Sequence, residues 1–223
     1  MARTLVFDVN ETLLDLAAFD PLIARIYGSA EVRGTWFAER QRLWLGGTAT
    51  GHYEDFPTLI ARALRSVGRS RGVDVADADV EAVLGAVVAL PPHADVAPAL
   101  DRLRGAGFRL AALTNGTLPA VRRQLASAGL AAFFDEMMSA GEVCRYKPAP
   151  EPYWLAAERL GESPGALTMV AAHAWDLYGA HRAGLRTAFV ARPGAQLVPG
   201  WPTPDVEGAD LGAVTDALLS ADA

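Results

Sequence analysis

Beyond the two prolines at residues 91–92, short apolar segments of strand length alternate with segments whose apolar residues recur at helical spacing. This alternation is typical of a parallel sheet with helices on both faces, because each strand returns to the sheet through a helix. The expected strands cover residues 109–115, 136–139, 167–172 and 186–191. The expected helices cover residues 94–104, 118–128, 151–160, 175–183 and 211–219. The sequence therefore predicts an α/β fold built on a doubly wound parallel sheet.

The segment before the prolines has a different pattern. Residues 4–10 form a short apolar run that ends in polar residues, which predicts a first buried strand. No strand-like run follows, and a break rich in Gly and Thr at residues 46–51 separates two helical segments. The expected helices cover residues 19–27, 32–45, 56–67 and 80–90. We expect a core domain of residues 1–14 and 91–223, with a helical domain of residues 15–90 inserted after the first strand.

Charge and hydropathy narrow the class of partner. The chain has 20 basic and 26 acidic residues spread along its length, whereas binding to nucleic acid requires a basic patch. No apolar stretch approaches the roughly 18 to 20 residues that a membrane span needs. The single cysteine, Cys144, leaves no internal disulfide and fits a reducing compartment. We therefore expect a cytoplasmic protein that binds neither nucleic acid nor membrane.

Lys147 is the only lysine among the 20 basic residues. A chain that otherwise uses arginine for its cations indicates a position where a compact ammonium is needed and a planar guanidinium would not fit. A surface lysine retained by chance is the alternative interpretation, and the count alone does not separate the two.

Polar side chains follow the expected strands at the point where each strand ends. Ligands bind at the carboxyl ends of the strands in open α/β sheets, where helix N-termini also converge. The side chains in question are Asp8, Asn10, Thr12, Thr114, Asn115, Lys147, His173 and Asp176. The sequence therefore predicts one site at this edge of the sheet.

Asp8 is the expected nucleophile of that site. A charge at the end of a buried strand is costly unless it is paired, so packing alone does not explain it. A nucleophilic carboxylate would form an ester intermediate and split one displacement into two easier steps. We expect Lys147 to neutralise Asp8 and Asp176, and Asp176 to orient a hydrolytic water with His173 one helical turn away.

Hydroxyl and amide groups complete the expected site. Thr12, Thr114 and Asn115 can donate hydrogen bonds to Asp8 or to a substrate carboxylate. Turn and cap chemistry is the alternative interpretation for these residue types, and a local hydrogen bond is the alternative for His173.

Four segments in order resemble the motifs of the haloacid dehalogenase superfamily: residues 7–13 (FDVNETL), 113–116 (LTNG), 146–148 (YKP) and 172–176 (AHAWD). Trp36, Tyr153 and residues 51–56 (GHYEDF) are similar to features of the type II L-2-haloacid dehalogenases. The resemblance covers nearly the whole chain. It implies a Rossmannoid core, a helical cap over residues 15–90, an aspartate nucleophile at Asp8, and neither metal nor cofactor.

Asn10 favours halide removal over phosphate ester hydrolysis, two reactions of that superfamily. The superfamily's phosphatases have an aspartate at this position, which protonates the leaving alcohol, and asparagine cannot give up a proton. A halide leaves without a proton. Asp8 and Asp176 also supply few of the oxygen ligands that the Mg²⁺ of the phosphatases requires. A Mg²⁺-dependent phosphatase with Glu11 as its acid, or a binding protein without turnover, remains the alternative.

The cap departs from the subgroup at one position. The resemblance implies an arginine directly after Trp36 that receives the halide or the carboxylate, and this chain has Phe37 there. Arg40 lies on nearly the same helical face and could substitute, or it could be a solvated residue paired with Glu39 or Glu31.

Two further residues, Tyr153 and Trp175, complete the expected substrate-binding set with Asn10, Phe37, Arg40, Thr114 and Asn115. Tyr153 is expected either to contact the site or only to pack. Departure of fluoride would need strong hydrogen-bond donors, and Trp175, His173 or Arg40 could supply them. The residues interpreted as structural or surface positions are His52, His93, His181, Cys144 and Trp44. The predicted reaction is hydrolytic removal of halide from a short 2-haloalkanoic acid through an aspartyl ester, which gives the 2-hydroxy acid. Dimerisation through the cap helices is a further expectation.

Overall fold

The computed structural model describes residues 3–222 and contains a sheet of six parallel strands. The strands lie in the order β3-β2-β1-β4-β5-β6, and every neighbouring pair is parallel. Their bounds are β1 Thr4–Phe7, β2 Arg109–Thr114, β3 Glu136–Ser139, β4 Leu167–Ala171, β5 Arg186–Val190 and β6 Val206–Gly208. The predicted α/β fold with a doubly wound parallel sheet is confirmed.

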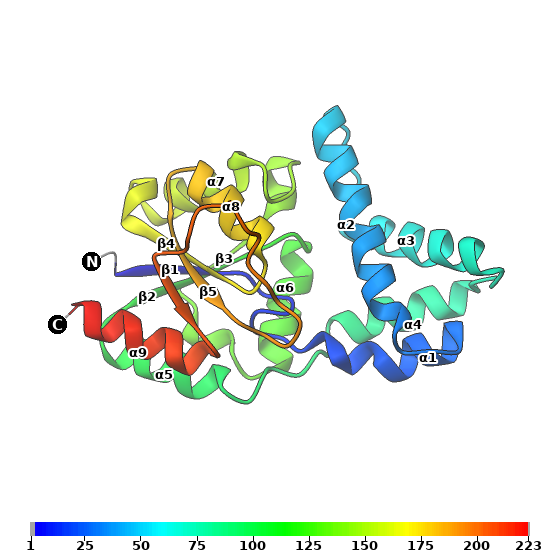
Figure 1. Cartoon of the computed structure of the whole chain (residues 1–223), viewed down its shortest axis with the longest axis horizontal. Helices are drawn as coiled ribbons and strands as arrows, with labels where there is room; N and C mark the ends of the chain where they lie inside the picture. Colours follow the sequence, from blue (N-terminus) through cyan, green and yellow to red (C-terminus); the bar gives the residue numbers. More distant parts are fainter. Residues whose placement is uncertain (1–2, 223) are drawn as a thin grey trace.

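Helices cover both faces of the sheet, because side chains of each strand alternate between two buried clusters. Helices α5, α6 and α9 lie on one side of the sheet, and α7 and α8 lie on the other (Figure 1). Leu5 and Phe7 belong to the buried cluster of the first side, and Val6 belongs to that of the second. The bounds of these helices are α5 Val96–Gly105, α6 Leu118–Ser127, α7 Pro150–Leu160, α8 Ala174–Arg182 and α9 Leu211–Asp222. Short 3₁₀ helices cover Leu16–Phe19, Ala131–Phe133, Ala140–Val143 and Pro164–Ala166.

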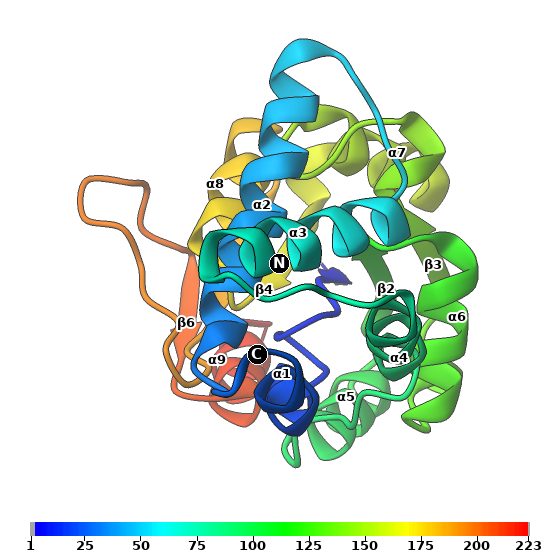
Figure 2. The same ribbon diagram turned by 90° about the vertical axis from the view of Figure 1, so that its right-hand side faces the viewer.

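A helical region lies between β1 and β2 in the sequence and beside the carboxyl ends of the strands in space (Figures 1 and 2). Its helices are α1 Asp20–Tyr27, α2 Val32–Thr50, α3 Phe56–Arg71 and α4 Asp77–Val87. They pack through buried apolar side chains such as Ile23, Leu64 and Val83. We call this region the cap. The site expected at the carboxyl ends of the strands therefore lies between the core and the cap.

The chain leaves and re-enters the core at one crossing. The backbone N–H of Asp15 donates to the carbonyl of Pro91 at 2.8 Å, and the N–H of His93 donates to the carbonyl of Leu13 at 3.0 Å. We propose this crossing as the boundary between a core domain of residues 1–14 and 91–223 and a cap domain of residues 15–90. Residues 1, 2 and 223 of that division lie outside the described range.

Two elements differ from the sequence-based expectation. The expected break at residues 46–51 is wrong, because α2 continues to Thr50 and ends at Gly51 in the left-handed conformation. Each helical glycine costs only about 1 kcal/mol, and Gly47 lets the backbone of His52 approach where a Cβ would lie 2.6 Å from its carbonyl oxygen. The three-residue strand β6 was not expected, since it is a short edge strand with an exposed Glu207.

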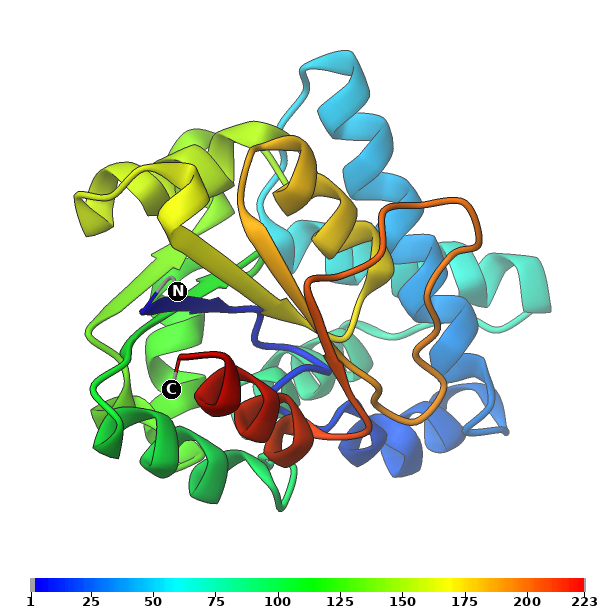
Figure 3. The ribbon, with the colours of Figure 1, turned by 60° about the vertical axis from the view of Figure 1, so that its left-hand side comes forward.

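The connection from β5 to β6 is long and extends from the sheet toward α2 and α8 (Figure 3). Its residues 193–196 face Arg33 and Phe37 of α2 across an outer cavity of about 580 Å³. Among residues 3–222, no helix is long and apolar enough to cross a bilayer.

Candidate active site

Lys147 lies at the centre of a buried charged cluster. Its Nζ donates to Asp8 Oδ1 at 2.9 Å, to Asp176 Oδ2 at 2.6 Å and to the carbonyl of Leu113 at 2.9 Å. The side chains of Lys147 and Asp176 are fully buried. The three donors of a compact ammonium are thus all used, which a planar guanidinium could not do in the same space.

The cluster keeps Asp8 ionised. Burial by itself would raise the pKa of the Asp8 carboxyl, but the Lys147 charge and a contact with His173 hold that pKa well below its usual range. Burial would likewise lower the pKa of the Lys147 ammonium, and the carboxylates of Asp176 and Asp8 raise it instead. A carboxylate and an ammonium are therefore both charged at neutral pH.

Asp176 is held from two sides. Its second oxygen, Oδ1, accepts a hydrogen bond from the hydroxyl of Tyr153 at 2.6 Å. Burial raises the pKa of that hydroxyl well above 10, so it remains a donor. Gly179 of α8 allows this contact, because a Cβ there would lie 2.7 Å from the Tyr153 hydroxyl oxygen. The hydroxyl of Tyr153 therefore contacts Asp176, and its contact with a substrate stays a prediction.

The other oxygen of Asp8 faces Thr12 and His173. The hydroxyl of Thr12 donates to Asp8 Oδ2 at 2.8 Å and accepts from the backbone N–H of Ala172 at 3.0 Å. Between Asp8 and Thr12 in the chain, Glu11 adopts a left-handed conformation with φ of 70°. His173 is the N-cap residue that precedes α8, and its Nδ1 lies 3.4 Å from Asp8 Oδ2.

Three amide and hydroxyl side chains fix the loops around the cluster. The Asn115 amide donates to the carbonyl of Lys147 at 3.2 Å and accepts from its backbone N–H at 2.8 Å. The hydroxyl of Thr114 accepts from the N–H of Gly116 at 3.0 Å. The Asn10 side-chain oxygen accepts from Gln124 Nε2 at 2.9 Å. These contacts position Lys147 and the two strand ends.

Arg40 faces the cluster from the cap and is 3% exposed. Its guanidinium carbon lies 4.8 Å from the ring centroid of Phe37, 4.9 Å from Phe56, 5.0 Å from Trp36 and 5.7 Å from Trp44. Burial lowers the pKa of Arg40 to about 10, which leaves it a cation at neutral pH. The alternative of a solvated arginine paired with Glu39 or Glu31 is therefore wrong.

Several hydrogen-bond donors beside Arg40 have no acceptor. Within the described chain, the buried Arg40 Nε and the indole nitrogens of Trp44 and Trp175 have no hydrogen-bond partner. A buried donor left in this state costs about 1–3 kcal/mol. Buried donors without a partner are typical of a binding site, because the ligand supplies the missing acceptor.

A cavity of about 20 Å³ separates the cluster from these donors. Eight of the side chains that the sequence assigned to the site line it: Asp8, Asn10, Phe37, Arg40, Thr114, Asn115, His173 and Trp175. The remaining four predicted residues, Thr12, Lys147, Tyr153 and Asp176, are not part of the wall. Thr12 and Lys147 contact Asp8 directly, Asp176 contacts Lys147, and Tyr153 contacts Asp176.

Two residues of the cavity wall, Phe56 and Trp44, were not among the predicted site residues. Trp44 is also a buried residue of the apolar core, which agrees with its interpretation as a structural residue. The signal was present in the spacing, since Trp36, Arg40 and Trp44 are four residues apart and share one face of α2.

The oxygens do not fit a divalent cation. Lys147 bridges the two carboxylates, Tyr153 takes the second oxygen of Asp176, and Gln124 takes the side-chain oxygen of Asn10. Magnesium prefers about six oxygen ligands in octahedral array. Elsewhere in residues 3–222, no group of three or more His, Cys, Asp or Glu side chains could hold a metal ion.

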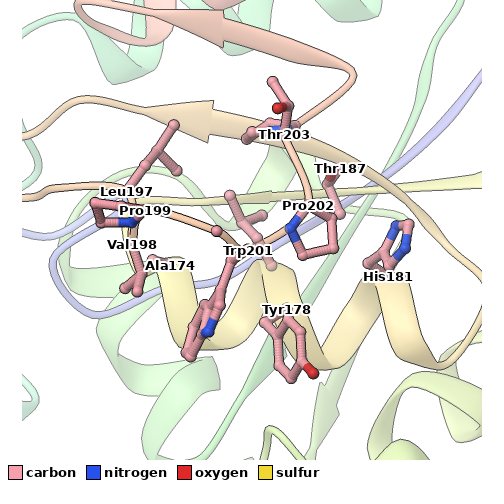
Figure 4. Close-up of a pocket in the computed structure, with 13 residues that line it drawn as sticks. Ala174, Tyr178, His181, Thr187, Leu197, Val198, Pro199, Trp201, Pro202 and Thr203 are labelled. Atoms are coloured by element: carbon pink, nitrogen blue, oxygen red, sulfur yellow. The ribbon is translucent and has the colours of Figure 1, made fainter.

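A separate cavity of about 280 Å³ lies outside the site, between α8 and the connection from β5 to β6 (Figure 4). Tyr178 and Trp201 stack there with ring centroids 4.5 Å apart. None of the charged cluster residues lines this cavity.

Comparison with known proteins agrees with this geometry. A model of the haloacid dehalogenase-like hydrolases matches residues 2–184. The chain belongs to this family. An (S)-2-haloacid dehalogenase of Pseudomonas sp. strain CBS-3 is 33% identical over 193 residues, which cover 85% of each protein. The (S)-2-haloacid dehalogenase 4A of Burkholderia cepacia is 31% identical over 86% of this chain and 84% of the relative.

Solved structures of haloacid dehalogenases have the same architecture. The L-2-haloacid dehalogenase of Xanthobacter autotrophicus superposes with a TM-score of 0.91 and 25% identity, over 98% of this chain and 99% of that one. The cap and the core are both included in the match.

Proposed function

We propose that this protein removes halide hydrolytically from short 2-haloalkanoic acids, of the haloacetate and 2-halopropionate class, and releases the 2-hydroxy acid. The observation that carries the proposal is an ionised carboxylate, Asp8, facing three partnerless N–H donors across a small cavity. Such a site can receive a small anion on the donor side while the carboxylate attacks from the other. The names of the relatives, (S)-2-haloacid dehalogenases, support the same activity.

In the first step Asp8 attacks the carbon that bears the halogen. We assign the attack to Oδ2, because Oδ1 is paired with the Lys147 ammonium, whereas Oδ2 accepts from the neutral Thr12 hydroxyl and faces His173 on the cavity wall. The halide leaves on the opposite side of the carbon, so the configuration there inverts. Arg40, Trp44 and Trp175 supply the buried donors that can take up the halide or the substrate carboxylate.

In the second step water attacks the carbonyl carbon of the aspartyl ester. Negative charge then develops on Oδ1, which is 2.9 Å from the Lys147 ammonium. A preorganised cation at that distance stabilises the transition state without moving. Asp176 was predicted to orient this water, and its two engaged oxygens favour a different role, that of positioning Lys147.

The residues around Asp8 favour a halide over an alcohol as the leaving group. An alkoxide needs a general acid, and the side chain two residues after the nucleophile is Asn10, which cannot release a proton. This position and the engaged carboxylate oxygens argue against the phosphatase alternative. Arg40 in its aromatic surroundings takes the place of the arginine that Phe37 replaces.

Halide release from a panel of acids tests the proposal. Fluoro-, chloro- and bromoacetate and the matching 2-halopropionates are incubated with the protein, and halide and hydroxy acid are quantified by ion chromatography. We expect equimolar halide and hydroxy acid from at least one of these acids. Absence of halide from all of them, or Mg²⁺-dependent hydrolysis of p-nitrophenyl phosphate instead, would overturn the proposal. Dimerisation stays a prediction, which light scattering on the purified protein tests.

A further inference from the structure

We propose that His173 is the catalytic base of ester hydrolysis and carries the product proton from the buried cavity to the outer cavity. This inference rests on the proposed function, because it concerns the second step of the same reaction. It assigns to a histidine the proton transfer that the sequence had placed mainly on Asp176.

The first observation is the geometry of the imidazole. His173 Nδ1 lies 3.4 Å from Asp8 Oδ2, is buried, and has no hydrogen-bond partner in the described part of the chain. The ring is stacked between Phe37, at 5.4 Å and 17°, and Trp175, at 5.2 Å and 28°. A nitrogen held in a fixed direction beside this carboxyl can take a proton from an attacking water once the carboxyl is esterified and has lost its charge.

The second observation is that the neighbouring acceptors are already engaged. Asp176 accepts from Lys147 at 2.6 Å through one oxygen and from Tyr153 at 2.6 Å through the other. The Asn10 oxygen accepts from Gln124, and an amide is in any case a very weak base. Among the titratable side chains on the cavity wall, His173 therefore offers the unengaged basic atom.

The third observation is that His173 belongs to two cavities. It lines the cavity of about 20 Å³ around Asp8 and also the outer cavity of about 580 Å³, and its side chain keeps 16% of its surface exposed. The fully buried Lys147 and Asp176 line neither cavity. A proton bound at His173 can thus reach the outer cavity through the second ring nitrogen without crossing the charged cluster.

The charged groups around His173 come from two sides. Asp8 and Glu11 approach from the segment after β1, and Arg33 and Arg40 approach from α2. Arg33 is 2.6 Å from Asp20 and 3.9 Å from Glu11, so its charge is largely compensated. The residues of the β5–β6 connection that face the outer cavity carry no charge.

The step balances with water as the only co-reactant. Water adds to the carbonyl carbon of the ester and gives one proton to His173 Nδ1. The bond between that carbon and the alcohol oxygen then breaks, and the alcohol oxygen takes a proton from His173. The Asp8 carboxylate is regenerated, and the second proton of the water leaves through His173 to solvent. The net products are the hydroxy acid and one proton, and no redox change occurs.

The test separates the two chemical steps by rapid-quench kinetics. In the His173→Gln variant we expect a halide burst of about one equivalent per site, followed by turnover slowed about 10²- to 10⁴-fold, the range of general-base catalysis. Intact-protein mass spectrometry would show the ester accumulating on Asp8. The matched control is His181→Gln, a histidine of α8 that lines neither of these two cavities, which should behave as wild type.

The separation of the two steps is a readout that a purely structural role would not move, because a loss of structure would lower the halide burst and the turnover together. Wild-type ester hydrolysis in the variant, or a burst lost in proportion to turnover, would overturn the role of His173. Absence of halide release from the wild type itself would overturn the proposed function.

Discussion

The core side and the cap side of the cavity differ in how their buried charged groups are paired. On the core side, Lys147 and Asp176 have partners for every charged atom, and Tyr153 completes the set. On the cap side, Arg40 is surrounded by aromatic rings, and its Nε has no acceptor, nor has the indole nitrogen of Trp44. Both sides are buried to a similar degree.

The difference distinguishes the nucleophile, whose charge is fixed in advance, from the hydrogen-bond donors that bind the substrate or the halide. A satisfied cluster fixes the charge of the nucleophile before substrate arrives, so the core side contributes to stability as well as to reaction. Partnerless donors destabilise the free protein and gain their partners with the ligand, so the cap side contributes to binding. Substitutions on the two sides should therefore separate activity from stability.

Loss of the nucleophile gives the largest expected effect. Asp8→Asn keeps the shape of the side chain but removes the attacking charge, so turnover should fall by about 10⁴-fold or more. The measurement is halide release at saturating substrate, with circular dichroism as the check on folding. Activity within tenfold of wild type would remove Asp8 from its role.

Loss of the ammonium tests the core side through stability. Lys147→Met leaves two buried carboxylates without their shared partner, and the free energy of unfolding should fall by about 3–5 kcal/mol. Urea denaturation measures it. Lys147→Arg is the matched variant, and it should recover little, because the space accepts three short contacts to one nitrogen. Full recovery by arginine would contradict the requirement for a compact cation.

Loss of the buried guanidinium tests the cap side. Arg40→Met should lower kcat/KM about 10²- to 10³-fold, because the anion loses a charged donor, while the free energy of unfolding stays equal or rises. The control is Arg42→Met on the same helix, where an exposed arginine pairs with Glu39. Destabilisation of Arg40→Met by more than about 2 kcal/mol would mean that Arg40 is structural.

Removal of a single indole donor has a smaller effect. Trp44→Phe keeps an aromatic ring beside Arg40 but deletes the partnerless N–H, so kcat/KM should fall about tenfold, the value of about one hydrogen bond to an anion. Trp154→Phe is the control, since Trp154 is 51% exposed and donates to Ala183 away from the cavity. Equal effects in both variants would deny Trp44 a role in binding.

Acidification should leave the first step unchanged. Because Lys147 and His173 hold the pKa of Asp8 below its usual range, the nucleophile stays ionised as pH falls from about 7 to 5. The rate of the halide burst, followed by stopped flow, should be flat over this window. A burst that falls along a single titration near pH 5 would show that the core side does not hold Asp8 ionised.

The core side could be predicted from the sequence because its residues lie at strand ends. The strands themselves are short apolar runs that are easily recognised in the sequence. Asp8, Lys147 and Asp176 all lie where the ends of β1, β3 and β4 bring them together. The role of Lys147 was also visible in composition, since a lone lysine stands out against arginines.

The cap side was less predictable because its residues meet through packing between helices. No local pattern shows that Phe56 of α3 faces Arg40 of α2, since this depends on how the two helices cross. The continuation of α2 to Thr50 was hidden by two glycines, which weaken helix propensity without ending a helix whose turns pack. Tyr153 was predicted to contact the site, and in the structure it contacts Asp176 of the charged cluster.

A single turnover in ¹⁸O-labelled water tests the central claim most directly. With protein in excess over the haloacid, the oxygen of the new hydroxyl group should come from the Asp8 carboxylate. We therefore predict unlabelled hydroxy acid, with ¹⁸O incorporated into the peptide that contains Asp8. Labelled hydroxy acid on the first turnover would mean that water attacks the substrate directly, and would contradict the account of Asp8 as a nucleophile.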